Sequence, residues 1–142
     1  MSTPSLRRFK ALAGSALLAG SLMTAAVAAE PFTPPTSSAV PYLSGGVGET
    51  ERDRMSAMAA AFNLKIVTAK PTGEYLAGVT LLIRDQEGRP MLSTVAQGPI
   101  LLAQLPPGRY SVMAINGDDI RQEAVTVRPA RQAVLRLHMD EA

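Results

Sequence analysis

The 142-residue chain predicts an all-β fold, a sandwich or barrel of short antiparallel strands, with one helix before it. Beyond Asn63 the apolar residues recur at every second position, which is the period of a half-buried strand. These alternating segments are short and evenly spaced, and Gly, Pro, Asn and Asp separate them. Many short strands with regular turn residues are typical of sandwiches and barrels.

Residues 1–28 have the composition of a signal peptide. Basic residues lie between Arg7 and Lys10, an apolar run extends from Ala11 to Val27, and small residues occupy Ala26 and Ala28. We expect cleavage after Ala28, or one residue later. The general secretory route is favoured, because the residues after the basic pair fit a twin-arginine signal poorly. The mature chain is therefore expected in the periplasm.

The composition of the mature chain excludes several classes of protein. There is no Cys in the sequence, so neither a lipid-modified cysteine nor a disulfide can form. No segment after the leader is apolar over the roughly 20 residues that a membrane span needs. Removing the leader leaves 11 of the 14 basic residues against 12 acidic ones. With this near-neutral charge and no Trp, we expect no nucleic-acid binding.

Residues 29–48 have the composition of a tether. Pro, Gly, Ser and Thr dominate the segment. Proline is excluded from helix interiors and central strands, and glycine raises the backbone entropy of the unfolded chain. We expect a partly extended, partly disordered spacer between the cleavage site and the domain. The alternative is that Tyr42 and Leu43 dock on the domain or on a partner.

Residues 49–62 are predicted to form a helix. Thr50 can act as its N-cap, and the second half is rich in Ala, which has the highest helix propensity. Met55, Met58 and Phe62 fall on one stripe of this helix. Because such a stripe must be buried, we expect it to cover the outer face of a sheet.

Seven strands are predicted after the helix. The tightest connection is Pro106-Pro107-Gly108, where we expect a type II turn with positive φ at the glycine. Adjacent acidic residues at Asp118 and Asp119 fit a polar hairpin tip. The predicted strands are residues 64–69, 79–85, 91–96, 100–105, 109–115, 121–127 and 133–139.

Alternation assigns the inner face of most strands. The residues expected to point inward are Val79, Leu81, Ile83, Tyr110, Val112, Ala114, Ala133, Leu135, Leu137 and Met139. Leu82, Leu101, Met113 and Ile115 break the pattern, because they are apolar and fall on the opposite face. A strand that is apolar on both faces requires an outer cover. We expect either the helix stripe or a second copy of the chain to supply it.

The predicted strands resemble a known domain family. The segments "LAGVTLLI", "DQEGRP", "GPILLAQLPPGRYSVMA" and "EAVTVRPARQAVLRL", between Leu76 and Met139, are similar to carboxypeptidase-regulatory-like or transthyretin-like domains. The upstream stretch "YLSGGVGETERDRMSAMAAAFNLKIV" looks like that of small exported proteobacterial proteins that place a short helix before such a domain. The resemblance implies a seven-stranded Greek-key sandwich over residues 63–142.

The resemblance implies no enzymatic residues in this chain. Its hydroxyisourate hydrolase branch uses several His and Arg residues and ends in a Tyr-Arg-Gly-Ser motif. This sequence has one histidine, His138, and ends in "RLHMDEA". A nucleophile also needs a nearby base, and alternation places His138 on an outer face. We therefore assign no catalytic residue, although a small hydrolase on this scaffold stays an alternative.

No metal or cofactor site is predicted either. Copper handling would use soft Met ligands, and five of the seven methionines lie in the mature chain. They occur singly in strands or on the helix stripe, where Met commonly fills gaps in a core. There is no run of Met at ligand spacing and no His cluster. A soft-metal chaperone is kept only as a further alternative.

The sequence thus predicts an exported, non-enzymatic β-sandwich that binds or assists another protein of the cell envelope. A homodimer is the other partner considered. The residues expected to form the interaction surface are Leu82, Leu101, Met113, Ile115, Met55, Met58 and Phe62.

Overall fold

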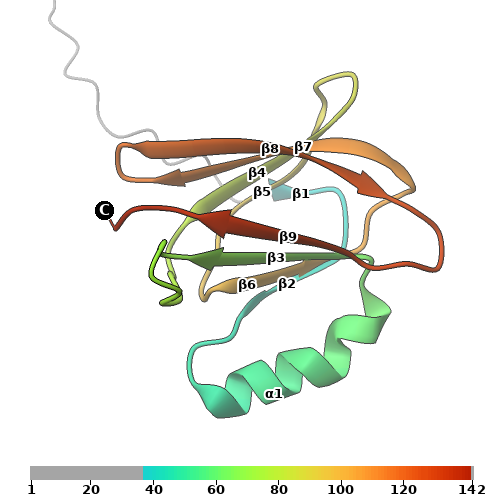
Figure 1. The fold of residues 1–142 in the computed structure, drawn as a ribbon. Coiled ribbons are helices and arrows are strands. Elements are labelled where there is room, and N and C mark those ends of the chain that lie inside the picture. Colours follow the sequence, from blue (N-terminus) through green and yellow to red (C-terminus); the bar gives the residue numbers. More distant parts are fainter. Residues whose placement is uncertain (1–36, 142) are drawn as a thin grey trace, which may run out of the picture. The chain divides into compact units, whose positions relative to one another are not determined.

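The computed structural model describes residues 37–141, which form two β-sheets and one short helix (Figure 1). The predicted signal peptide, residues 1–28, and the first part of the predicted tether, residues 29–36, lie outside the described residues. Within the described chain, no helix has the length and apolar character needed to cross a membrane.

The two sheets contain five and four strands. The five-stranded sheet has, in spatial order, β1 (Ser37–Ser38), β5 (Pro90–Val95), β4 (Thr80–Asp85), β7 (Gly108–Asn116) and β8 (Asp119–Val127). The four-stranded sheet has, in spatial order, β2 (Tyr42–Gly45), β6 (Ile100–Ala103), β3 (Leu64–Ala69) and β9 (Ala133–His138). The helix α1 (Glu49–Met58) continues into the 3-10 turn η1 (Ala59–Ala61).

Residues 37–141 contain nine strands rather than the seven predicted. The seven predicted segments all occur as β3 to β9, with ends shifted by at most two residues. The two additional strands, β1 and β2, come from the second half of the predicted tether. β2 pairs antiparallel with β6, with Leu43 opposite Leu102. Residues 42 and 43 thus dock on the domain, because β6 would otherwise leave one backbone edge unpaired.

One strand pair departs from the antiparallel arrangement that the sequence predicts. β3 and β9 run parallel, with Ile66 opposite Leu135 and Thr68 opposite Leu137. The other strand pairs in the two sheets are antiparallel. The parallel pair arises because the chain returns to the four-stranded sheet only after completing the β7–β8 hairpin of the other sheet.

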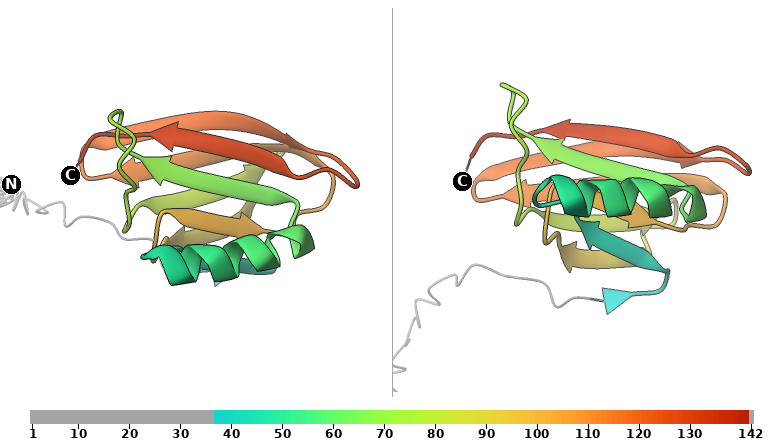
Figure 2. Two further views of the ribbon diagram at one scale, coloured as in Figure 1. Left: turned by 60° about the horizontal axis from the view of Figure 1, so that its bottom comes forward. Right: turned by 90° about the horizontal axis from the view of Figure 1, so that it is seen from below.

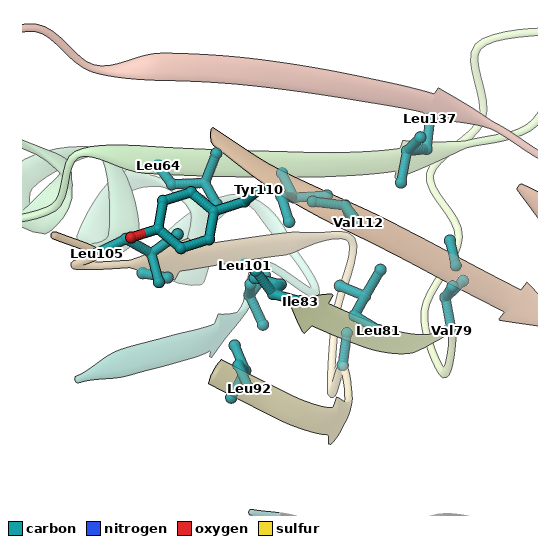
Figure 3. Packing of buried hydrophobic residues seen from close by; sticks show 14 of the residues in the cluster. Leu64, Val79, Leu81, Ile83, Leu92, Leu101, Leu105, Tyr110, Val112 and Leu137 are labelled. Atoms are coloured by element: carbon teal, nitrogen blue, oxygen red, sulfur yellow. The ribbon is translucent and has the colours of Figure 1, made fainter. Parts of the chain in front are cut away.

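The core lies between the two sheets (Figure 3). The alternation read from the sequence is confirmed for β4 and β7, because Leu81, Ile83 and Val112 are buried there. Leu101 also lies in this core and is 1% exposed. The prediction that Leu101 faces outward is therefore wrong. In β6 the residues that face outward are Ile100 and Leu102. The strand is apolar on both faces, as predicted, but the residues assigned to the inner and outer faces are exchanged.

The connection between β6 and β7 is held by a side chain of the core. The Tyr110 hydroxyl donates a hydrogen bond to the Pro106 carbonyl oxygen, and the Tyr110 ring is buried in the core. Gly108 has φ 158°, close to extended backbone, and is the first residue of β7. The φ of Gly108 is positive, as predicted, but it is far from the roughly 80° that a type II turn requires. The predicted type II turn is therefore wrong, because the glycine has already joined the strand.

The helix covers the four-stranded sheet on the side away from the core (Figures 1 and 2). Met55 is 3% exposed and forms a second apolar cluster with Ile100 and Leu102. Phe62 packs at the edge of this cluster, whereas Met58 is 50% exposed. The predicted cover thus holds for Met55 and Phe62, and the inclusion of Met58 is wrong. Met58 lies three residues after Met55 in α1, whereas Ala59, four residues after Met55, packs against the cluster, so the buried stripe continues through Ala59 instead.

The start of the helix differs from the predicted cap. Gly48 occupies the N-cap position with φ 82°, and Thr50 is already inside the first turn. The helix is instead tied to the preceding loop by Glu51, whose Oε2 accepts a hydrogen bond of 3.1 Å from the Val47 backbone N–H. A carboxylate in the first turn also interacts favourably with the positive end of the helix dipole.

Candidate functional site

Apolar side chains form a row across the outer face of the five-stranded sheet. The strand register places Thr80 beside Val95 on one side and beside Ile115 on the other, and Ile115 opposite Ile120. These four residues therefore lie side by side across β5, β4, β7 and β8. At about 4.8 Å between strands, the row extends for roughly 14 Å.

A second row lies next to the first. Leu82 is opposite Met113 in the β4–β7 pair, and both side chains are half-buried. Ile115, in the first row, is also half-buried, whereas Ile120 is 59% exposed and Val95 is 37% exposed. We call Thr80, Leu82, Val95, Met113, Ile115 and Ile120 the apolar outer face.

No helix or strand of residues 37–141 lies over the apolar outer face. The helix lies below the four-stranded sheet, on the far side of the sandwich (Figures 1 and 2). Helix α1 therefore buries Ile100 and Leu102 but leaves Leu82 and Met113 without a cover from the described chain. Contiguous apolar surface of this kind marks interaction sites on soluble proteins.

Of the seven residues predicted to form an interaction surface, the structure brings three together. Leu82, Met113 and Ile115 lie on the apolar outer face. Leu101 belongs to the core, and the other predicted residues belong to the helix and its junction with β3: Met55, Met58 and Phe62. The prediction therefore joined residues from the outer face of one sheet, from the core, and from the helix that covers the other sheet.

Sequence reasoning missed three members of the apolar outer face. Val95 and Ile120 each stand next to a turn, at the end of a strand, where exposure is expected. Thr80 alternates with the inward-facing Val79 and Leu81, but its hydroxyl group gives no apolar signal in the sequence. Their common signal is β-branching, which favours a pleated surface and is shared by Ile115. Only the strand register shows that the four residues are neighbours.

The residues considered for acid–base chemistry lie apart from the apolar outer face. His138 is exposed at the end of β9. Asp119 is held in the chain's own structure, because its carboxylate accepts the Asp140 backbone N–H at 2.8 Å and lies 2.9 Å from Arg121 Nε. In the part of the chain that the structure describes, no group of three His, Asp or Glu residues is arranged to hold a metal ion.

The ionisable groups with shifted pKa values stabilise turns and the chain end. Partial burial raises the pKa of Asp85, but the Arg89 backbone N–H and guanidinium outweigh it and bring that pKa below its ordinary value. Hydrogen bonds to Glu141 and Glu74 raise the pKa of the Lys70 ammonium. Burial, then the nearby Asp85 charge, raises the pKa of Tyr110. None of these groups faces the apolar outer face.

The geometry of this surface is suited to contact rather than to chemistry. Its side chains are aliphatic, Met or Thr, and its polar border includes Gln122, whose Nε2 donates a 2.9 Å hydrogen bond to Ser111 Oγ. An apolar centre with a polar rim is the composition of protein interfaces. Compared with known proteins, the chain matches no protein-family model, and no curated protein matches its sequence.

Proposed function

We propose that this protein is an exported, non-enzymatic β-sandwich module that binds another protein of the cell envelope. The observation that carries the proposal is the apolar outer face, a double row of apolar side chains that no described helix or strand covers. The partner would lay apolar side chains across β4 and β7, where Leu82 and Met113 are central. Periplasmic location is part of the proposal and rests on the leader-like composition of residues 1–28.

The proposal also includes a transthyretin-like fold. We propose that strands β3 to β9 form the Greek-key sandwich implied by the resemblance of residues 76–139, and that β1 and β2 extend its two sheets. This scaffold serves many unrelated functions, so its presence does not itself indicate an activity. The arrangement of side chains on the apolar outer face therefore carries the functional argument.

The proposal can be tested by crosslinking inside the cell that makes the protein. A photoreactive amino acid replaces Met113 at the centre of the apolar outer face. In a matched strain it replaces Arg136, which is exposed on the outer side of the four-stranded sheet. We expect illumination to join the protein to one other envelope protein from position 113 and not from position 136.

Three other outcomes would contradict the proposal. A product of twice the protein's own mass would assign the face to a second copy of this chain. A crosslink within one chain to residues 29–36 would assign it to the protein's own preceding segment. Equal products from positions 113 and 136 would show that the apolar outer face has no specific partner.

A further inference from the structure

An open cavity of about 660 Å³ lies at one end of the sandwich, away from the apolar outer face. Three segments meet there: η1 with the two residues that follow it, the β6–β7 connection, and the β8–β9 turn (Figure 1). The lining is mixed, partly polar and partly apolar, and its apolar residues include Phe62, Pro106, Pro107 and Pro129. The charged side chains that line the cavity are Arg128 and Arg131.

Arg128 and Arg131 face each other across the β8–β9 turn. They are partners in an antiparallel β-bridge, so their side chains leave the backbone on the same side. The Cβ atoms of such partners are roughly 5 Å apart, and like charges placed directly opposite each other destabilise a strand pair. The turn between them includes Ala130 at φ 58°, in the left-handed region that disfavours L-residues. The fold therefore holds the two positively charged side chains close together, and this arrangement lowers the local stability of the turn.

The described chain does not neutralise this pair. Among residues 37–141, neither guanidinium forms an ion pair or donates a hydrogen bond, and the cavity lining contains no Asp or Glu. Other arginines of the same chain do have partners, since Arg89 pairs with Asp85 and Arg121 pairs with Asp119. With respect to residues 37–141, the Arg128–Arg131 pair thus has its hydrogen-bonding capacity free for a ligand.

The walls of the cavity are fixed by side-chain hydrogen bonds. Asn63 Nδ2 donates to the Leu105 carbonyl at 2.6 Å, and Asn63 Oδ1 accepts the Leu105 N–H at 2.9 Å. Gln132 Nε2 donates to the carbonyls of Ala59 at 2.9 Å and Phe62 at 3.2 Å. The end of the helix, the β6–β7 connection and the β8–β9 turn are therefore tied to the same framework. A site with fixed walls loses little entropy when a ligand binds.

We propose that this cavity binds an organic carboxylate whose apolar part contacts the cavity floor. Guanidinium groups bind carboxylate oxygens through paired, charge-assisted hydrogen bonds. Pro106 and Phe62 offer apolar surface to the carbon skeleton next to that carboxylate. Two sources share this chemistry: a small organic acid, or the C-terminal carboxylate of a polypeptide that ends in an apolar residue. The site is independent of the apolar outer face.

Calorimetric titration of the purified protein tests the proposal with four probes. They are N-acetyl-alanyl-leucine, its C-terminal amide, hexanoate and inorganic phosphate. We expect at least one of the two carboxylates to bind. If the peptide acid binds, its amide should bind about tenfold or more weakly, because the amide removes the charge that the arginines recognise. Binding of hexanoate alone assigns the source to small acids, and binding of the peptide acid assigns it to a polypeptide terminus.

The matched variants are Arg128→Gln, Arg131→Gln and Arg136→Gln. The first two should each weaken carboxylate binding about tenfold, whereas Arg136→Gln, on an exposed strand position outside the cavity, should leave it unchanged. All three side chains are exposed, so each variant is expected to fold. The proposal is overturned if neither carboxylate binds, if phosphate binds as tightly as the better carboxylate, or if all three variants bind alike.

Discussion

Leu101 and Leu102 are neighbours in β6 and belong to two different apolar clusters. Leu101 packs in the core between the sheets, and Leu102 packs beneath the helix with Met55. Both are almost completely buried. A single four-residue strand thus joins the sandwich core to the helix layer. The stability of the helix layer should therefore depend on the few side chains that contact the outer side of β6.

Met55 and Met58 provide a matched test of this helix layer. Met55→Ala should lower the free energy of unfolding by about 2 to 5 kcal/mol, because it leaves a cavity above Leu102 and Ile100. Met58→Ala changes the same residue type on the same helix at an exposed position, and it should cost less than about 0.5 kcal/mol. Urea denaturation measures both changes. Equal losses for the two variants would mean that the helix does not pack through Met55.

Ala130 lies in the left-handed region with φ 58°. Glycine adopts this conformation without a steric penalty, so Ala130→Gly should raise the free energy of unfolding by about 0.5 to 1 kcal/mol. Ala57→Gly, at an exposed position of α1, is the control and should lower it by about 1 kcal/mol. Thermal unfolding of the two variants gives the sign of each effect. A loss of stability in Ala130→Gly would show that the turn does not hold residue 130 in this conformation.

Asp85 organises the β4–β5 hairpin and makes its stability depend on pH. Its Oδ1 accepts the backbone N–H groups of Glu87 at 3.0 Å and Arg89 at 2.8 Å, and its Oδ2 lies 2.9 Å from Arg89 Nε. The folded state therefore has a pKa for Asp85 below the ordinary value of 3.8. The resulting stabilisation is present above that ordinary value and is lost as the pH falls through the lowered, folded-state pKa.

Asp85→Asn should consequently lower the melting temperature at pH 7, and the difference from the unchanged protein should shrink as the pH falls below about 4. Glu87→Gln is the control, because Glu87 Oε2 is 3.5 Å from Arg89 Nη2 and its side chain is 65% exposed. Its melting temperature should stay close to that of the unchanged protein. Melting curves between pH 2 and pH 7 measure the two differences. A difference for Asp85→Asn that is constant over this range would contradict the role given to the charge.

The sequence was a good guide to the seven strands β3 to β9 and to most of the core. The period-2 alternation in β4 and β7 marks one apolar side clearly, and that side is the core. The Ala-rich composition and the apolar stripe that includes Met55 predicted the helix. The apolar outer face was harder to predict from the sequence, because its residues are spread over four strands and become neighbours only through the strand register.

The sequence by itself determined where strands β3 to β9 lie and which residues of β4 and β7 face inward, because alternation is a local property of a strand. The tertiary structure decided which side of β6 faces the core and which side faces the helix. Ile100, Leu101 and Leu102 are all apolar, so only the pairing with β2 and β3 and the position of the helix distinguish the core side from the helix side. The tertiary structure also decided that the turn with Arg128 and Arg131 borders a cavity, because segments distant in the sequence form the other walls of that cavity.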